Sequence, residues 1–195
     1  MIPHNIILAD PPWHYSNRKT GGERKDKTRF GGGAMKYYPL MKDRDLLEMA
    51  PFIKSLAAEN CHMFMWATGA RMDFATDLMA AWGFKFCTVW MIWIKTTKNA
   101  GFIFPQQGNG LIYGPGSYTG SNAEFVLLGR KGKALKQTKA MTPSIFFAPR
   151  QERHSQKPDV VHERIDLLYP EARKIELFAR REYRDWACWG NEVTA

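Results

Sequence analysis

The stretch IILADPPW, residues 6–13, decides the fold of this chain and presents its first candidate site. Its apolar first half is short and continuous, which predicts a buried β-strand. A proline after Asp10 keeps that residue extended, and because Pro11 and Pro12 fix φ and carry no N–H group, the strand ends in a stiff turn. The sequence therefore predicts that a carboxylate and the large ring of Trp13 are held together at the carboxyl end of a strand.

Beyond this strand, strand-like and helix-like segments alternate along the chain. Apolar, β-branched or aromatic runs predict strands at residues 61–69, 84–95, 123–132, 144–150, 173–180 and 185–192. Helical periodicity and helix start signals predict helices at residues 43–50, 51–59, 70–83 and 157–170. Asp43 is expected to cap the first of these helices. Such alternation predicts an α/β fold with a mostly parallel sheet in three layers.

The length of 195 residues suits a single domain over residues 1–195, with long polar loops at about 14–37 and 96–121. Loops of that length are usually functional or disordered. In parallel sheets, ligands bind at the carboxyl ends of the strands. Asp10, Lys95 and Arg180 all fall at predicted strand ends, so we expect one crevice to collect them.

Basic residues outnumber acidic ones, 28 to 19, and give a formal net charge of +9. They concentrate in two segments, with seven Lys and Arg between Asn17 and Lys36 and eight between Arg130 and Lys157. Clusters of this kind suit loops that neutralise the phosphates of a nucleic acid. The alternative is an ordinary solvated lysine surface, which basicity alone does not exclude.

The remaining composition argues against a membrane protein and against a metalloprotein. No apolar run approaches the roughly 18 residues of a membrane span, and the first residues lack a signal-peptide pattern. Cys61, Cys87 and Cys188 are far apart, so we expect buried thiols rather than a zinc site or a disulfide framework. The five histidines include no HxxxH or HExxH pair, and no metal is predicted.

A series of short segments occurs in an order that matches a known family. They are ADPPW at 9–13, YPLM at 38–41, MFMWATG at 63–69, WIK at 93–95, EFVLLGRKG at 124–132, SQKPD at 155–159, and RKIELFAR at 173–180 followed by WGNE at 189–192. With these segments the chain resembles the adenine-N6 methyltransferases with a DPPW motif. That family includes the catalytic subunit of the eukaryotic messenger-RNA adenosine methyltransferase, and the likeness is greatest to its short bacterial and phage members.

The resemblance implies a Rossmann-like, S-adenosylmethionine-dependent methyltransferase whose motif order is circularly permuted, because the ELF segment follows the catalytic motif. It implies methylation of adenine N6. DNA is the expected polymer, because the short members usually act on DNA. The expected location is the cytoplasm of a bacterium or of a phage-infected cell. An RNA adenine methyltransferase, a cytosine-N4 methyltransferase and a non-catalytic nucleic-acid-binding subunit are the alternatives. The intact motif from Asp10 to Trp13 disfavours the last two. A protein partner and the oligomeric state are left open.

The chemistry accounts for the residue types of the motif. An exocyclic adenine amine is a poor nucleophile, because its lone pair is delocalised into the ring. The Asp10 carboxylate can accept one amino hydrogen and the Pro11 carbonyl the other, while Pro12 stiffens the turn. Trp13 is expected to stack against the flipped-out base.

By the resemblance, the cofactor is bound by Asp10, Lys157, Arg180 and Asn191, with Ser155, Gln156 and Glu192 as weaker candidates. The nucleic acid is expected to meet two residues near the target base and three loop cations, namely Tyr38, Lys95, Lys25, Lys27 and Arg29. Two departures from the family pattern limit the transfer of roles. The upstream acidic cofactor contact of longer members has no counterpart, and residues 181–183 receive no role.

Overall fold

Seven strands form one sheet in the computed structural model of the chain, which describes residues 2–15, 40–98, 110–114, 118–150 and 156–193. The strands are β1 (His4–Ala9), β2 (Ala57–Thr68), β3 (Lys85–Thr96), β4 (Ala123–Lys131), β5 (Ile145–Pro149), β6 (Lys174–Leu177) and β7 (Ala187–Trp189). Each coincides with a segment predicted to be extended, although β1 begins two residues and β2 four residues before the expected start, and β3 ends one residue later than expected.

The strand order is β5-β3-β4-β2-β1-β6-β7. Strand β1 pairs in parallel with β2 and β6, and parallel pairing also joins β3 to β5 and β6 to β7. Only β4 is antiparallel to its neighbours, β2 and β3. The prediction of a mostly parallel α/β sheet is therefore confirmed. The antiparallel direction of β4 was not predicted from the sequence.

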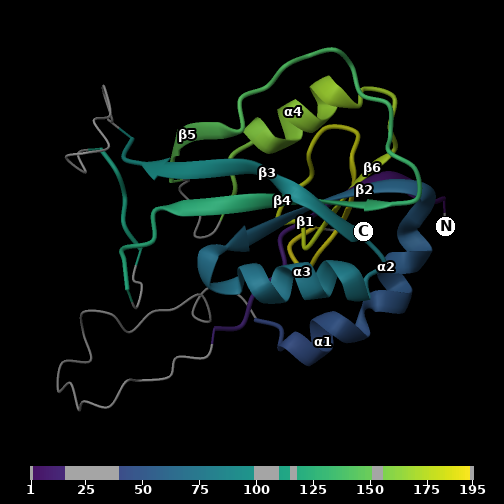
Figure 1. The fold of residues 1–195 in the computed structure, drawn as a ribbon, viewed down its shortest axis with the longest axis horizontal. Coiled ribbons are helices and arrows are strands. Elements are labelled where there is room, and N and C mark those ends of the chain that lie inside the picture. Colours follow the sequence, from purple (N-terminus) through teal and green to yellow (C-terminus); the bar gives the residue numbers. More distant parts are fainter. Residues whose placement is uncertain (1, 16–39, 99–109, 115–117, 151–155, 194–195) are drawn as a thin grey trace.

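Helices cover both faces of the sheet and produce three layers (Figure 1). The elements are α1 (Asp43–Glu48), α2 (Ala50–Leu56), the 3-10 turn η2 (Gly69–Arg71), α3 (Met72–Ala81) and α4 (Val160–Leu168). In Figure 1, α1, α2 and α3 lie on one side of the sheet and α4 lies on the other. None of the helices in the described residues has the length and apolar character needed to cross a membrane.

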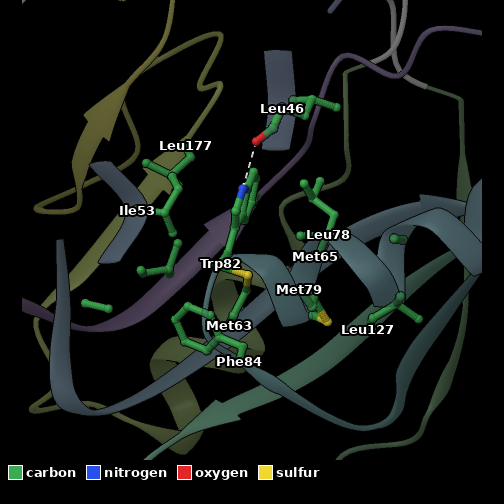
Figure 2. Close-up of a cluster of buried hydrophobic side chains, with 14 of the residues drawn as sticks. Leu46, Ile53, Met63, Met65, Leu78, Met79, Trp82, Phe84, Leu127 and Leu177 are labelled. Atoms are coloured by element: carbon green, nitrogen blue, oxygen red, sulfur yellow. Dashed lines mark hydrogen bonds between the residues drawn. The ribbon is translucent and has the colours of Figure 1, made fainter. Parts of the chain in front are cut away.

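The core under α3 forms as the helical periodicity predicts. Ala75, Leu78, Met79 and Trp82 are all fully buried on one face. Figure 2 shows Trp82 among the apolar side chains of the neighbouring strands, with its indole N–H donating to the Leu46 carbonyl at 2.9 Å. This bond joins the end of α3 to α1, so one buried donor fixes how two helices pack.

The core under α4 lies on the other face of the same strands. Val161, Ile165 and Leu168 are buried there against apolar strand residues that include Ile6 and Leu8 of β1. Ile7 and Ala9 of the same strand face the core under α3. Burial on both faces explains why this strand is a continuous apolar run rather than an alternating one.

Three local predictions are wrong. Lys42, not Asp43, is the extended N-cap residue of α1, and Asp43 already lies in its first turn, where an acid still favours the helix dipole. Helix α2 ends at Leu56 because β2 takes over at Ala57. Cys61 is buried, but Cys87 is exposed on β3 and Cys188 is only half-buried.

The direction of each strand determines which residues meet at one edge of the sheet. Because β4 is antiparallel to both β2 and β3, the carboxyl ends of β1, β2, β3 and β6 share one edge with the amino end of β4. We call it the active edge. The basic residues that follow the end of β4 at Lys131 therefore lie toward the opposite edge.

Candidate active site

The DPPW turn is held by backbone hydrogen bonds from both sides. The Asp10 N–H donates to the Leu177 carbonyl of β6 at 3.4 Å, and the Met41 N–H donates to the Pro12 carbonyl at 3.0 Å. Within the turn, the Trp13 N–H donates to the Pro11 carbonyl at 2.8 Å. A carbonyl has two lone pairs, so the Pro11 oxygen can accept a second hydrogen.

A pocket opens at the active edge directly beside this turn. Its empty space amounts to about 360 Å³ when the open solvent at its mouth is included. Its lining residues come from the turn after β1, from β2 and β4, and from the segments before α4 and after β6. They are Asp10, Pro11, Trp13, Tyr15, Trp66, Ala67, Thr68, Glu124, Lys157 and Arg180. Of the predicted site residues, Asp10, Pro11, Trp13, Lys157 and Arg180 are thus brought together.

Four charged side chains of alternating sign lie in a row along this edge. The Lys157 ammonium contacts Asp10 Oδ2 at 2.8 Å and Glu124 Oε2 at 3.3 Å. The other oxygen of Glu124 contacts the Lys95 ammonium at 2.5 Å. Lys95, which is predicted to end its strand, lies one residue before the end of β3 and reaches the pocket through Glu124. We call Asp10, Lys157, Glu124 and Lys95 the charged row.

The two carboxylates of the row have opposite pKa shifts. Burial raises the pKa of Asp10, and the Lys157 ammonium opposes this rise. Burial also acts to raise the pKa of Glu124, but the ammonium groups of Lys157 and Lys95 outweigh it and hold the pKa below its usual value. Glu124 is therefore the firmly ionised acid, and Asp10 is the one more readily protonated.

Trp13 belongs to the core as much as to the pocket. It is only 5% exposed and packs edge-on against Phe74, with ring centroids 6.2 Å apart. The Arg71 guanidinium lies 5.6 Å from its ring centroid. Tyr15 is 37% exposed in the same pocket wall, and its hydroxyl lies 3.1 Å from Thr68 Oγ1. Both residues line the pocket, and Tyr15 is the more exposed of the two.

Two loops cross closely where the remaining cofactor candidates lie. The Ala179 N–H donates to the Trp189 carbonyl at 3.0 Å. A side chain at Gly190 would place its Cβ 2.2 Å from the Ala179 carbonyl oxygen, so only glycine permits this approach. The crossing brings Glu192 to 3.8 Å from the Arg180 guanidinium. Asn191 follows Gly190 directly and is exposed.

Several predicted residues lie outside the crossing and the charged row. Gln156 is half-buried immediately before Lys157. Ser155, Tyr38, Lys25, Lys27 and Arg29 lie outside the described residues, and their roles stay predictions. Among the described residues, no group of three or more His, Cys, Asp or Glu side chains could hold a metal ion.

Sequence reasoning missed Glu124 and Tyr15. Glu124 is an acid at the start of an otherwise apolar strand, and that signal is informative only once the strand is known to run antiparallel. Tyr15 follows the motif at a spacing of two from Trp13, which would place both rings on the same side of an extended chain.

The chain matches one family model and several known proteins over nearly its full length. The family model described as MT-A70 matches residues 4–192. The chain is similar to a type II methyltransferase, M.MunI, of a Mycoplasma species, with 32% identity over 97% of this chain and 78% of the relative. It is also similar to an N(6)-adenosine-methyltransferase MT-A70-like protein of Drosophila melanogaster, with 26% identity over 96% of this chain but only 26% of the relative. For the N(6)-adenine-specific methyltransferase METTL4 of Homo sapiens, identity is 25% over 97% of this chain and 37% of the relative.

Proposed function

Because the chain belongs to the MT-A70 family, we propose that it transfers a methyl group to the N6 amine of adenine in DNA. The choice of adenine N6 follows from the family and its relatives. The choice of DNA rests on the likeness to the short bacterial members, since the chain spans 78% of the Mycoplasma type II methyltransferase but about a quarter of the Drosophila protein. The observation that carries the proposal is Asp10 in a stiff turn, beside Lys157, in a pocket that opens at the carboxyl ends of the parallel strands.

We propose S-adenosylmethionine as the methyl donor, and the pocket residues suit it. Its amino acid end carries one carboxylate and one ammonium group, and the pocket offers both cations and carboxylates. Arg180 and Lys157 are suited to the carboxylate, and Asn191 and Glu192 beside the loop crossing are suited to hydroxyl and amine groups. When bound, the donor supplies a methyl group on a positively charged sulfur.

Asp10 and Pro11 activate the target amine in this proposal. The Asp10 carboxylate accepts one amino hydrogen and the Pro11 carbonyl accepts the other, which directs the nitrogen lone pair away from the ring. The hydrogen bonds around the turn hold both acceptors before the base arrives, so no reorganisation is needed at the moment of transfer. Ionised Asp10 is required, because a protonated carboxyl group would present a donor.

The target base must leave its helix to reach these acceptors, and stacking on an aromatic ring offsets part of the unstacking cost. Trp13 was expected to provide the ring, but little of it is exposed. We assign the larger share of the stacking surface to Tyr15, with Trp13 as the wall behind it. Contacts with the nucleic acid are still proposed for Tyr38, Lys25, Lys27 and Arg29. Lys95 is proposed to act indirectly, through its ion pair with Glu124.

Side-by-side transfer assays test this proposal. Purified protein is given tritium-labelled S-adenosylmethionine and matched DNA and RNA oligonucleotides, each with and without adenine. Label in adenine-containing DNA is the expected result. A clear preference for RNA would refute the choice of polymer, label in oligonucleotides that contain cytosine but no adenine would refute the target atom, and no label in any of them would favour a binding subunit.

A further inference from the structure

Glu124 is the residue of the charged row to which no role has yet been given. It is the second residue of β4, and its Cα is registered opposite Thr68 of β2 on one side and Trp93 of β3 on the other. Its side chain is only 13% exposed, yet it contacts ammonium groups from two different segments, Lys95 and Lys157. Burial of a carboxylate carries a desolvation penalty, which the ion pairs with the two ammonium groups must offset. An arrangement of this kind suggests a role for the contacts beyond stability.

The two lysines are restrained in matching ways on either side of Glu124. The Lys157 ammonium lies 5.5 Å from the ring centroid of Trp66, and the Lys95 ammonium lies 5.3 Å from that of Trp93. The two indole rings pack edge to face with centroids 6.1 Å apart. Glu124 on β4 therefore links two cation–aromatic pairs, whose rings lie on the strands to either side of it, β2 and β3.

The position of Lys157 determines how Asp10 is presented. Lys157 contacts Oδ2 of Asp10 and Oε2 of Glu124, so its ammonium is shared between two carboxylates. Without the second carboxylate, the ammonium could move toward Asp10 and occupy the lone pairs that the amine hydrogens need. With it, Lys157 stays against Trp66 and Asp10 keeps one orientation.

We propose that Glu124 is a positioning residue for methyl transfer, which acts by anchoring Lys157 and thereby orienting Asp10 toward the target amine. This assignment rests on the proposed function. The groups that bear on Asp10 are Lys157, Glu124 and Arg180, with Lys95 behind Glu124. The negative charge of Glu124 contributes to the raised pKa of Asp10, whereas Lys157 and Arg180 lower it.

The test is Glu124→Gln, which keeps the shape of the side chain and removes its charge. We expect kcat for adenine methylation to fall about 10²-fold, the usual cost of a misplaced catalytic group. The acidic limb of the kcat–pH profile should move to lower pH, because loss of the Glu124 charge lowers the pKa of Asp10. Binding of S-adenosylhomocysteine, measured by calorimetry, reports separately on whether the pocket is intact.

A second variant and a surface control complete the design. Glu124→Gln combined with Lys95→Met removes one charge of each sign, so it leaves the net charge unchanged and avoids an unpaired lysine. It should show the same downward shift of the acidic limb. Glu48→Gln removes the acid of an ion pair on α1, where Arg44 lies 2.7 Å away and Glu48 is 59% exposed, and it should leave kcat and the profile unchanged.

The outcomes separate this assignment from the proposed function. Wild-type kcat in Glu124→Gln, an unmoved acidic limb in both Glu124 variants, or failure of both variants to fold would overturn it and leave Glu124 a purely structural residue. No transfer to adenine by the wild-type protein would refute the proposed function itself, and the assignment with it.

Discussion

Asp10 combines two properties that rarely occur together in one side chain. Its backbone is fixed by a proline turn and by the carbonyl of Leu177, and its carboxylate is held by the Lys157 ammonium. Burial nevertheless raises its pKa, so the group keeps a strong affinity for protons. A rigid acceptor of high basicity is what an unreactive amine requires.

Replacement of Asp10 tests its role directly. Asp10→Ala should lower the transfer rate by about 10²- to 10⁴-fold, the usual contribution of a positioned acid or base. Asp10→Asn keeps the shape and should lose a similar amount, because the amide cannot supply a charged acceptor. Both variants should still bind S-adenosylhomocysteine in a calorimeter, whereas methylation at the wild-type rate by either one would contradict the assigned role.

The pH dependence of transfer follows from the raised pKa. Activity requires ionised Asp10, so kcat should rise as pH increases through the pKa of that group. Since burial raises this pKa, the acidic limb should lie above the ordinary carboxyl value of 3.8. Single-turnover rates at constant ionic strength, with a check that the protein stays folded, provide the measurement. A rate that stays constant down to the ordinary carboxyl range would count against Asp10.

Tyr15 is expected to act on substrate binding rather than on cofactor binding. Tyr15→Ala should raise KM for the nucleic acid, because stacking of one base on an aromatic ring is worth about 1–3 kcal/mol. Tyr15→Phe keeps the ring and removes the hydroxyl that contacts Thr68 Oγ1, so it serves as the matched control. Equal KM values for Tyr15→Ala and the wild type would return the stacking role to Trp13.

At the scale of elements, the loops that follow β6 and β7 depend on one close approach. Phe178 adopts a positive φ of 60°, and the next residue, Ala179, accepts the crossing of Gly190. This geometry positions Arg180 at the pocket. The side of the pocket proposed to bind the cofactor thus depends on backbone shape as well as on side chains.

Gly190→Ala should disturb that crossing. Its new Cβ would meet the Ala179 backbone, so the unfolding free energy should fall by about 1–3 kcal/mol, typical of overpacking. Affinity for S-adenosylhomocysteine should fall with it, because Arg180 is displaced. Gly69→Ala is the control, since the nearest atom to its Cβ would be a Phe125 ring carbon at 3.8 Å. If calorimetry and thermal unfolding gave the same values for both variants, the crossing would not be the constraint.

The sequence predicted most elements because burial leaves a periodic trace. The apolar face of α3 and the continuous run of β1 are both visible without a structure. Strand direction produces no such pattern in the sequence, because successive side chains point to opposite faces of the sheet whichever way the strand runs. Reversal of β4 therefore stayed hidden, and Glu124 with it. Burial of Cys87 was predicted wrongly, because the first four residues of β3 are exposed and Cys87 is one of them.

At the scale of the whole molecule, the excess positive charge is distributed between the two edges of the sheet. Lys157 lies at the active edge, whereas Lys133, Lys136 and Lys139 follow the far end of β4. The lysines at the start of the second basic segment and Lys157 at its end therefore lie toward opposite edges of the sheet. A nucleic acid that enters the pocket meets the cations of the active edge first.

Charge reversal can compare the loop cations Lys25, Lys27 and Arg29, which are proposed to contact the nucleic acid, with the lysines that follow β4. Exchange of Lys25, Lys27 and Arg29 for Glu should weaken DNA binding and reduce the slope of log K against log salt by up to about 3, since each phosphate contact contributes about 0.9. Exchange of Lys133, Lys136 and Lys139 for Glu changes the net charge equally and should alter the slope less. Equal slopes for both triple variants, in fluorescence anisotropy titrations, would assign the first group to plain surface.

The most direct test of adenine methylation is a map of modified bases. The wild-type chain and the Asp10→Ala variant are expressed in a host that lacks adenine methylation, and the host DNA is read by long-read sequencing that detects modified adenines. N6-methyladenine in DNA from the wild-type culture, and its absence with Asp10→Ala, is the predicted result. Unmodified adenine in both cultures, or the same modification in both, would contradict the assignment of Asp10 as the activating group of a DNA adenine methyltransferase.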